Sequence, residues 1–132
     1  MCFSLARAFA ALGHVTQVVS LRDADWRSGG RHRPGDVDVV FLNATNTAQE
    51  VVRLRRHLKK QPHDICHGVG TGASVVSFFA ERFAKGAGRT AVVASEHYWD
   101  GPHYGDFPHL RGRVLGNLYR YALRRVDGIV CV

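Results

Sequence analysis

The residue types best suited to chemistry stand together at residues 96–99, where the sequence reads EHYW. A carboxylate, an imidazole and two aromatic rings follow one another there, directly after the apolar residues 91–94. Near neutral pH an imidazole can donate or accept a hydrogen bond, and the rings of Tyr98 and Trp99 offer flat apolar faces to a ligand. The abrupt change of character marks these residues as a candidate site, and the alternative is an ordinary solvent-exposed loop.

Two other strand-like segments, residues 37–43 and 63–68, also end in polar or small residues. In open parallel sheets, ligands bind beyond the carboxyl ends of the strands, where the connecting loops meet. If these segments are parallel strands, their ends and residues 96–99 form one candidate binding site. The residues at these ends that we expect to line the site are Asn43, His67, Gly68, Gly70 and Thr71.

Strand-like and helix-like segments alternate along the chain and would position these residues. Apolar residues at helical spacing predict helices over residues 3–12, from Thr47 through RLRRHLKK, over 74–85 and over 113–125. Apolar runs predict strands over residues 14–21, 37–43, 63–68, 89–95 and 127–132. This order predicts an α/β fold, with a parallel sheet covered by helices in a single domain, residues 1–132.

Three local features sharpen this prediction. The near-continuous apolar character of residues 37–43 predicts a strand buried on both faces. Gly13 is expected to end the first helix. Thr47 is expected to cap the second helix.

Composition narrows the classes of function. The chain has 132 residues, of which 45% are apolar, so it can bury a core. A formal charge of +7 predicts an anionic partner, although the sequence carries no nucleic-acid-binding motif and we expect no nucleic acid. Three cysteines without a C-x-x-C motif fit a reducing cytosol, and no apolar run is long enough to span a membrane. The eight histidines lack convergent ligand spacing, so no metal site is expected.

Four segments of the chain resemble family-4 glycosyltransferases, in matching order and spacing. The family's first helix and second strand resemble LARAFAALGHVTQVVS, and its "DvvHaHg" strand resembles HDICHGVGTGAS. Its strand ending in histidine resembles TAVVASEH, and its "aD.vvavS" helix and strand resemble YRYALRRVDGIVCV. The resemblance implies the N-terminal, acceptor-side domain of a GT-B enzyme, which is a Rossmann-like half of that fold. Such enzymes are retaining and metal-independent, and they move a sugar from a nucleotide-sugar to a carbohydrate or lipid-linked acceptor.

The resemblance also assigns roles to residues. His97 matches the histidine that faces the catalytic cleft, so we expect His97 to be catalytic, with Glu96 orienting it or binding acceptor hydroxyls. His67 matches the first histidine of the "HaH" pair, and Val69 stands where the second would be. Asp127 matches an aspartate that is usually structural. The residues expected to bind the acceptor are Asn43, His67, Gly68, Gly70, Thr71, Tyr98 and Trp99.

The family's first strand, its glycine-rich loop and its C-terminal donor-binding domain have no counterpart in this sequence. We therefore expect the isolated chain to be inactive and to work with a donor-binding domain. A non-catalytic module that pairs in trans with a donor-binding chain is an alternative. No cofactor is expected beyond the nucleotide-sugar substrate. An unpaired sheet edge at the position of the first strand predicts a homo-oligomer.

Two segments keep further alternatives open. GVGTGA, residues 68–73, matches the G-x-G-x-x-G/A pattern, and Glu96 stands where a ribose-binding acid belongs, which favours a dinucleotide (NAD-type) site. The other interpretation is that these glycines permit a tight turn and close helix packing. RLRRHLKK is either a solvated helix face or a surface that rests on anionic lipid. We expect a cytoplasmic location. If RLRRHLKK rests on anionic lipid, the protein associates peripherally with the inner face of the membrane.

Overall fold

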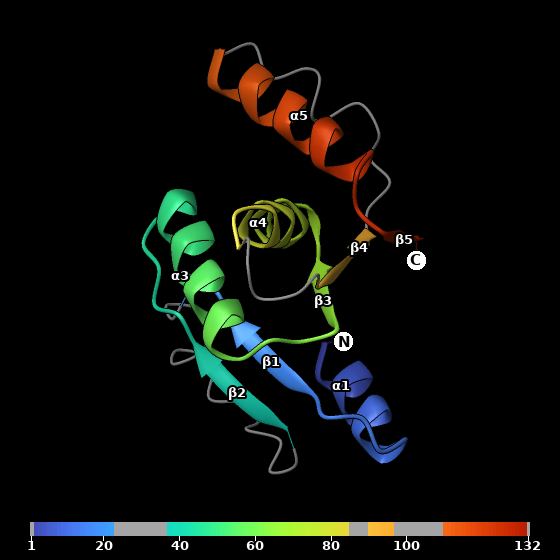
Figure 1. Ribbon diagram of the computed structural model, residues 1–132. Helices are drawn as coiled ribbons and strands as arrows, with labels where there is room; N and C mark the ends of the chain where they lie inside the picture. The colour runs from blue at the N-terminus through green and yellow to red at the C-terminus, as the bar shows by residue number, and fades with distance from the viewer. Residues whose placement is uncertain (1, 23–36, 85–89, 97–109, 132) are drawn as a thin grey trace. The chain divides into compact units, whose positions relative to one another are not determined.

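The computed structural model describes residues 2–22, 37–84, 90–96 and 110–131 (Figure 1). These residues fall into two compact units, Met1–Arg53 and Leu54–Val132, which are treated separately below. The predicted single domain over residues 1–132 stays a prediction.

The first unit contains a helix, two parallel strands and the start of a second helix. Helix α1 spans Cys2–Ala11, β1 spans Gln17–Ser20, β2 spans Asp38–Phe41, and α3 begins at Thr47 and runs to Lys60. The strands pair in parallel from Gln17 opposite Asp38 to Ser20 opposite Phe41. Along β2, Asp38 is exposed and the next three residues are half-buried. The expected burial of this strand on both faces is therefore only partial.

Gly13 ends α1, as the sequence predicts. Its φ is +89°, in the left-handed region that favours glycine. Its N–H donates to the carbonyl of Ala10, and the N–H of His14 donates to the carbonyl of Phe9. This bond pair is the Schellman motif, which satisfies carbonyls that the end of a helix leaves open.

The cap of α3 is Asn46 rather than the predicted Thr47. Asn46 Oδ1 accepts a hydrogen bond from the backbone N–H of Gln49 at 3.0 Å, and Thr47 is already the first helical residue. The side chain of Gln49 reaches back to Thr45, where Oε1 accepts the backbone N–H at 3.2 Å. Asparagine and threonine both favour the cap position, so sequence alone places the cap only to within one residue.

In the part of the chain that the structure describes, the second unit contains the rest of α3, a three-stranded parallel sheet and two further helices. Strand β3 spans Ile65–Val69, α4 spans Thr71–Arg82, β4 spans Ala91–Glu96, α5 spans Leu110–Leu123 and β5 spans Gly128–Cys131. The strands lie in the order β3-β4-β5, all parallel. The predicted α/β class with parallel strands is confirmed, and each predicted element is present with its ends shifted by a few residues.

Helices α4 and α5 pack on the same face of this sheet (Figure 1). The core joins Phe78 of α4, Val92 of β4 and Ala122 of α5, each at most 5% exposed. Right-handed connections between successive parallel strands place both helices on one face in this way. Because side chains alternate along a strand, Val92 and Ala94 face the helices, whereas Val93 and Ser95 face the other side.

Candidate functional site

The turn from β3 to α4 is the best-defined part of the predicted site. Ser74 Oγ donates to the carbonyl oxygen of Gly70 at 2.9 Å and to that of Gly68 at 3.1 Å. The backbone N–H of Ser74 also donates to the carbonyl of Gly70 at 3.0 Å. The buried Ser74 thus holds the turn closed from the helix side.

The glycines of this turn have different tasks. A Cβ added to Gly68 would lie 2.5 Å from Cα of Ser74, so the absence of a side chain lets α4 pack closely on β3. Gly70 has φ +83° and ψ 162°, a conformation that essentially only glycine adopts. A Cβ added to Gly72 would contact nothing within 4 Å. This geometry agrees with the interpretation of the glycine run as a tight turn with close helix packing.

Strand β4 ends beside this turn. Val69 pairs with Ser95, and the N–H of Gly70 donates to the carbonyl of Ser95 at 2.8 Å. Glu96 is the last residue of β4. The backbone of Glu96 therefore lies at the same carboxyl edge as Gly70 and Thr71, which is the arrangement that the sequence predicts for these three residues.

The structure does not bring four other predicted residues, His97, Tyr98, Trp99 and Asn43, to this edge. His97, Tyr98 and Trp99 lie outside the described residues. Asn43 belongs to the first unit, where it is exposed, has φ +52° and accepts a hydrogen bond from Arg53 Nη1 on its carbonyl at 2.6 Å. The structure therefore does not join Asn43 to the residues of the second unit.

His67 lies within β3 rather than at its end. It pairs with Val93, two residues before the strand terminates at Val69. Gly68 faces α4, so the alternation of the strand directs the His67 side chain to the opposite face of the sheet. His67 is half-buried, and its Nε2 atom is buried. Any contact with an acceptor would occur on this opposite face.

Ser95 is a polar residue whose burial sequence reasoning missed. Its side chain lies on the same face of the sheet as His67 and is 2% exposed. Its Oγ has no hydrogen-bond partner among the residues that the structure describes. The sequence signal was only a hydroxyl at the end of an apolar strand, which does not distinguish a buried position from an exposed one.

The surroundings of Cys66 disfavour a role as a nucleophile. It lies on the face of β3 that packs against α4. Burial raises the pKa of its thiol, a hydrogen bond with Ser77 acts in the opposite direction, and the charge of Glu81 raises the pKa further. A raised pKa keeps the thiol protonated, and the thiolate is the reactive form of cysteine.

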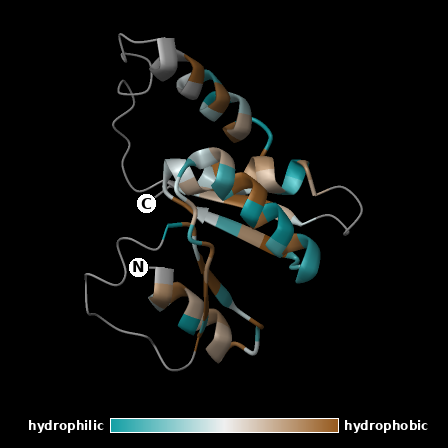
Figure 2. Cartoon of the chain, turned by 90° about the vertical axis from the view of Figure 1, so that its left-hand side faces the viewer, coloured by the Kyte–Doolittle hydropathy of each residue, from teal (hydrophilic) through white to brown (hydrophobic). Residues whose placement is uncertain are grey.

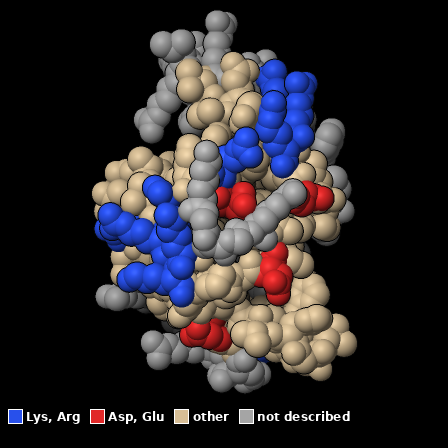
Figure 3. Space-filling view, viewed as in Figure 1, with Lys and Arg blue, Asp and Glu red and all other residues tan. Residues whose placement is uncertain are grey.

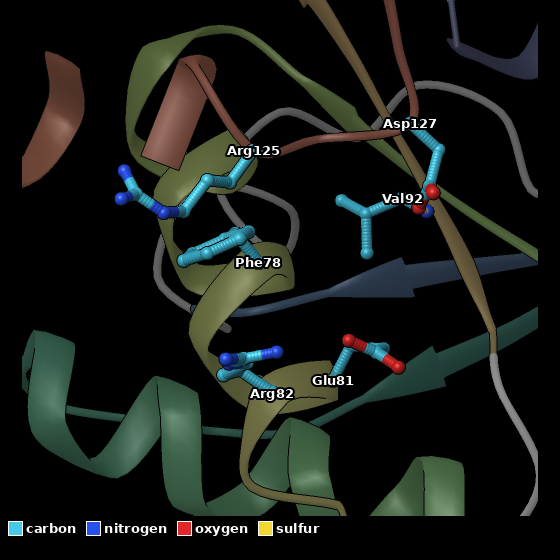
Figure 4. A pocket seen from close by; sticks show the side chains of 6 residues that line it. All are labelled: Phe78, Glu81, Arg82, Val92, Arg125 and Asp127. Carbon is cyan, nitrogen blue, oxygen red and sulfur yellow. Dashed lines mark hydrogen bonds between the residues drawn. The ribbon is translucent and has the colours of Figure 1, made fainter. Parts of the chain in front are cut away.

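A pocket of about 490 Å³ lies at the opposite edge of the same sheet (Figure 4). Val92 is near the start of β4 and Asp127 precedes β5, so the pocket is at the amino ends of these strands. Asp127 Oδ2 accepts the N–H of Val92 at 2.9 Å, and the N–H of Asp127 donates to the carbonyl of Val92 at 2.8 Å. Asp127 thereby joins β5 to β4, the structural role that the sequence predicts. The lining residues are Phe78, Glu81, Arg82, Val92, Arg125 and Asp127.

Two features that would indicate other functions are absent from the described residues. No group of three or more potential metal ligands occurs within residues 2–22, 37–84, 90–96 and 110–131. In those same ranges, no helix has the length and apolar character that crossing a membrane requires.

Comparison with known proteins gives one match. The sequence model of Glycosyltransferase Family 4 matches residues 1–132, the full length of the chain. No curated protein matches the chain, and no solved structure matches it. The family match covers every segment in which the sequence resembles that family, and it agrees with the parallel α/β architecture. The chain belongs to glycosyltransferase family 4.

Proposed function

We propose that this chain is the acceptor-side domain of a retaining glycosyltransferase. The reaction would move a sugar from a nucleotide-sugar to a carbohydrate or lipid-linked acceptor. The observation that carries the proposal is the family match over residues 1–132. The geometry supports it, because the carboxyl ends of β3 and β4 lie side by side and bring Gly70, Thr71 and Glu96 to one edge.

The β3–α4 turn offers groups that suit an acceptor. Gly70 occupies the cap position of α4, and no side chain caps this helix terminus. The N-terminal end of a helix carries a partial positive charge and favours hydroxyl oxygens or phosphate as hydrogen-bond acceptors. Glu96 serves in this proposal to orient His97 or to bind acceptor hydroxyls. In this proposal His97 positions the acceptor or stabilises the sugar in the transition state.

An amide-resolved NMR titration of the 132-residue chain tests where an acceptor binds. With glucose or maltose as the probe, we expect shifts at residues 67–71 and 95–96 and none at residues 125–127 beside the pocket. Shifts confined to residues 81–82 and 125–127, or no saturable shift with either sugar, would contradict the proposal. A parallel titration with NADH tests the dinucleotide alternative, which predicts shifts at residues 68–73 that sugars do not produce.

The basic side of α3 supports a second element of the proposal, contact with an anionic membrane surface. Along α3, hydrophilic and hydrophobic residues alternate (Figure 2). Leu54 and Leu58 are buried. Lys and Arg side chains gather over this helix (Figure 3). Each cation near an anionic lipid surface contributes about 1 kcal/mol of binding. The basic residues concerned are Arg55, Arg56, Lys59 and Lys60.

Vesicle sedimentation tests this contact. We expect the chain to bind vesicles that contain phosphatidylglycerol, to release them in high salt, and not to bind vesicles of phosphatidylcholine. Replacing the four basic residues of α3 with glutamine should abolish binding to the anionic vesicles. If the substituted chain binds as tightly as the original, α3 is simply a solvated helix face.

The full reaction also requires a donor-binding partner. We propose that a donor-binding domain, in the same polypeptide or in trans, supplies the nucleotide-sugar site, and that the chain alone does not turn over. Release of nucleoside diphosphate by the purified chain would contradict this. Self-association through a sheet edge stays a prediction, which sedimentation velocity over a range of concentrations will test.

A further inference from the structure

Aromatic rings from two helices of the second unit lie against one another at its surface. The ring of Phe79 in α4 and that of Tyr121 in α5 are inclined by only 7°, with their centroids 6.5 Å apart. The ring of Phe83, just past the end of α4, lies 6.1 Å from that of Phe79. Tyr121 also meets the buried ring of Phe78 edge to face at 6.0 Å. The core of the unit therefore holds these surface rings in place.

Apolar side chains of α5 extend this surface along the helix. Val114, Leu118 and Tyr121 are four and three residues apart, so they lie on one face of α5. Together with Phe83 they are between 39% and 52% exposed. We call Phe79, Phe83, Val114, Leu118 and Tyr121 the aromatic face. A contiguous exposed apolar surface of this kind usually marks a site of interaction.

Arginines border the aromatic face. Arg120 and Arg124 lie one turn apart on the exposed side of α5, and Arg82, the last residue of α4, is also exposed. Lys and Arg side chains gather visibly over α5 (Figure 3). The guanidinium carbon of Arg125 lies 3.9 Å from the centre of the Tyr121 ring. This cation–π contact holds a positive charge directly beside the apolar residues.

The charge around the aromatic face is positive in total. The four arginines stand against two carboxylates, of which Asp127 already accepts the N–H of Val92 and Glu81 is half-buried. Residues 110–126 contain no acidic residue. The adjoining segments outside the described ranges, residues 85–89 and 97–109, add two basic and two acidic residues by sequence. They leave the positive excess unchanged, so the surface complements an acidic partner.

Among acidic partners, the composition of this surface favours a protein. Phenylalanine, tyrosine and arginine are the side chains enriched at protein interfaces. A lipid surface attracts lysine and arginine alike, whereas residues 110–126 contain five arginines and no lysine. Rings held in fixed positions suit the defined side chains of a protein, and a fluid lipid surface requires no such shape. A second copy of the chain would bring arginines against arginines, which like-charge repulsion opposes.

We propose that the aromatic face binds an acidic amphipathic helix of a partner protein. The apolar residues of that helix pack on Leu118 and Tyr121, and its carboxylates pair with the guanidinium groups of Arg120, Arg124 and Arg125. Tyr121 is the anchor, because the core fixes its ring from one side. The inference is independent of the proposed acceptor-side function, since none of these residues lies at the carboxyl edge of β3 and β4.

Fluorescence anisotropy with a labelled synthetic peptide tests the inference on the full chain. The probe is an amphipathic peptide with leucine at the spacing of Val114, Leu118 and Tyr121, and with glutamate and alanine elsewhere. A comparison peptide has lysine in place of each glutamate. We expect saturable binding of the acidic peptide, which added salt weakens, and no binding of the lysine peptide.

Two substitutions separate the apolar contact from the charged one. Leu118→Gln and Arg125→Gln should each weaken binding of the acidic peptide about tenfold. Both residues are exposed, and a melting curve checks that each variant keeps its fold. The matched control is Val52→Gln, which makes the same kind of change at an exposed apolar position on α3 and should have no effect.

An amide-resolved NMR titration with the acidic peptide locates the contact. We expect shifts at residues 79–83 and 114–125 and none at residues 67–71, where the acceptor is proposed to bind. Equal binding of the acidic and lysine peptides would overturn the inference, and so would an affinity that neither Leu118→Gln nor Arg125→Gln changes.

Two further results would assign the aromatic face to another occupant and thereby overturn the inference. One is binding to phosphatidylglycerol vesicles that Leu118→Gln abolishes, in a chain that does not bind the acidic peptide. The other is self-association in sedimentation velocity that Leu118→Gln abolishes. The first would make this face a lipid surface, and the second would make it an interface between copies of the chain.

Discussion

Substituting alanine for Gly68 tests the close packing of α4 on β3. The added Cβ would lie 2.5 Å from Cα and 2.7 Å from N of Ser74, and both are backbone atoms of α4. Because backbone cannot rotate away like a side chain, the helix must move. Moving it also strains the Ser74 hydroxyl contacts with the turn at 2.9 and 3.1 Å. Overpacking of this kind costs about 1–3 kcal/mol, and we expect the upper part of that range.

Urea and thermal unfolding measure this cost. At about 4 °C per kcal/mol for a chain of this size, Gly68→Ala should lower the Tm by roughly 8–12 °C. Gly72→Ala is the matched control, because Gly72 is exposed and helical, and a Cβ added there would contact no other part of the structure within 4 Å. It should be neutral or raise stability by up to about 1 kcal/mol, as alanine does in helices. If the Tm of Gly68→Ala stays within about 2 °C of the original, the destabilisation is only roughly half a kcal/mol, and the packing argument is refuted.

Three further predictions concern local interactions. Asn46→Ala should cost about 1 kcal/mol in urea unfolding, whereas Thr47→Ala should be nearly neutral, and the reverse order would restore Thr47 as the cap. Asp127→Ala removes the acceptor of the Val92 N–H and should cost about 1–3 kcal/mol, with Asp127→Asn costing less; equal losses would show that the hydrogen bond contributes little. Burial raises the pKa of Cys66, so above about pH 8.5 the unfolded chain releases a proton that the folded chain keeps, and stability falls as pH rises. Unfolding free energies at pH 7.5 and pH 10 should therefore differ more for the original chain than for Cys66→Ala, and an identical difference would contradict the assigned cause.

The succession of helices and strands could be predicted from the sequence because its signals are local. Apolar spacing identifies each element, and Gly13 carries the φ that ends α1. The parallel pairing of β3, β4 and β5 followed from the helices predicted between these strands, whereas the sequence predicts no helix between β1 and β2 that would indicate their parallel pairing. The cap of α3 was misplaced by one residue because Asn46 and Thr47 are both good caps, and only the hydrogen bond to Gln49 distinguishes them.

The candidate site was harder to predict because it depends on contacts between distant residues. The turn at Gly70 could be anticipated, since a glycine run after a strand is a local pattern. The same holds for the aromatic face, where Phe79 and Tyr121 come from two helices and no spacing rule reveals their stacking. The side chain of His67 lies on the face of the sheet away from α4, and this depends on which face of β3 packs against α4. That choice is made by Gly68 and Ser74 together rather than by either residue alone.

Turnover of a His97→Ala variant tests the central claim most directly. The measurement uses the enzyme in which this domain works with a donor-binding domain, and it records nucleoside diphosphate release together with the Tm. We predict that His97→Ala lowers turnover by about 10²-fold or more, a typical loss for a transition-state hydrogen-bond donor, with little change in Tm. His63→Ala, before the amino end of β3, is the control and should retain turnover. Unchanged turnover in His97→Ala, or a loss of turnover that merely follows a lowered Tm, would contradict the assignment of this edge as the acceptor site.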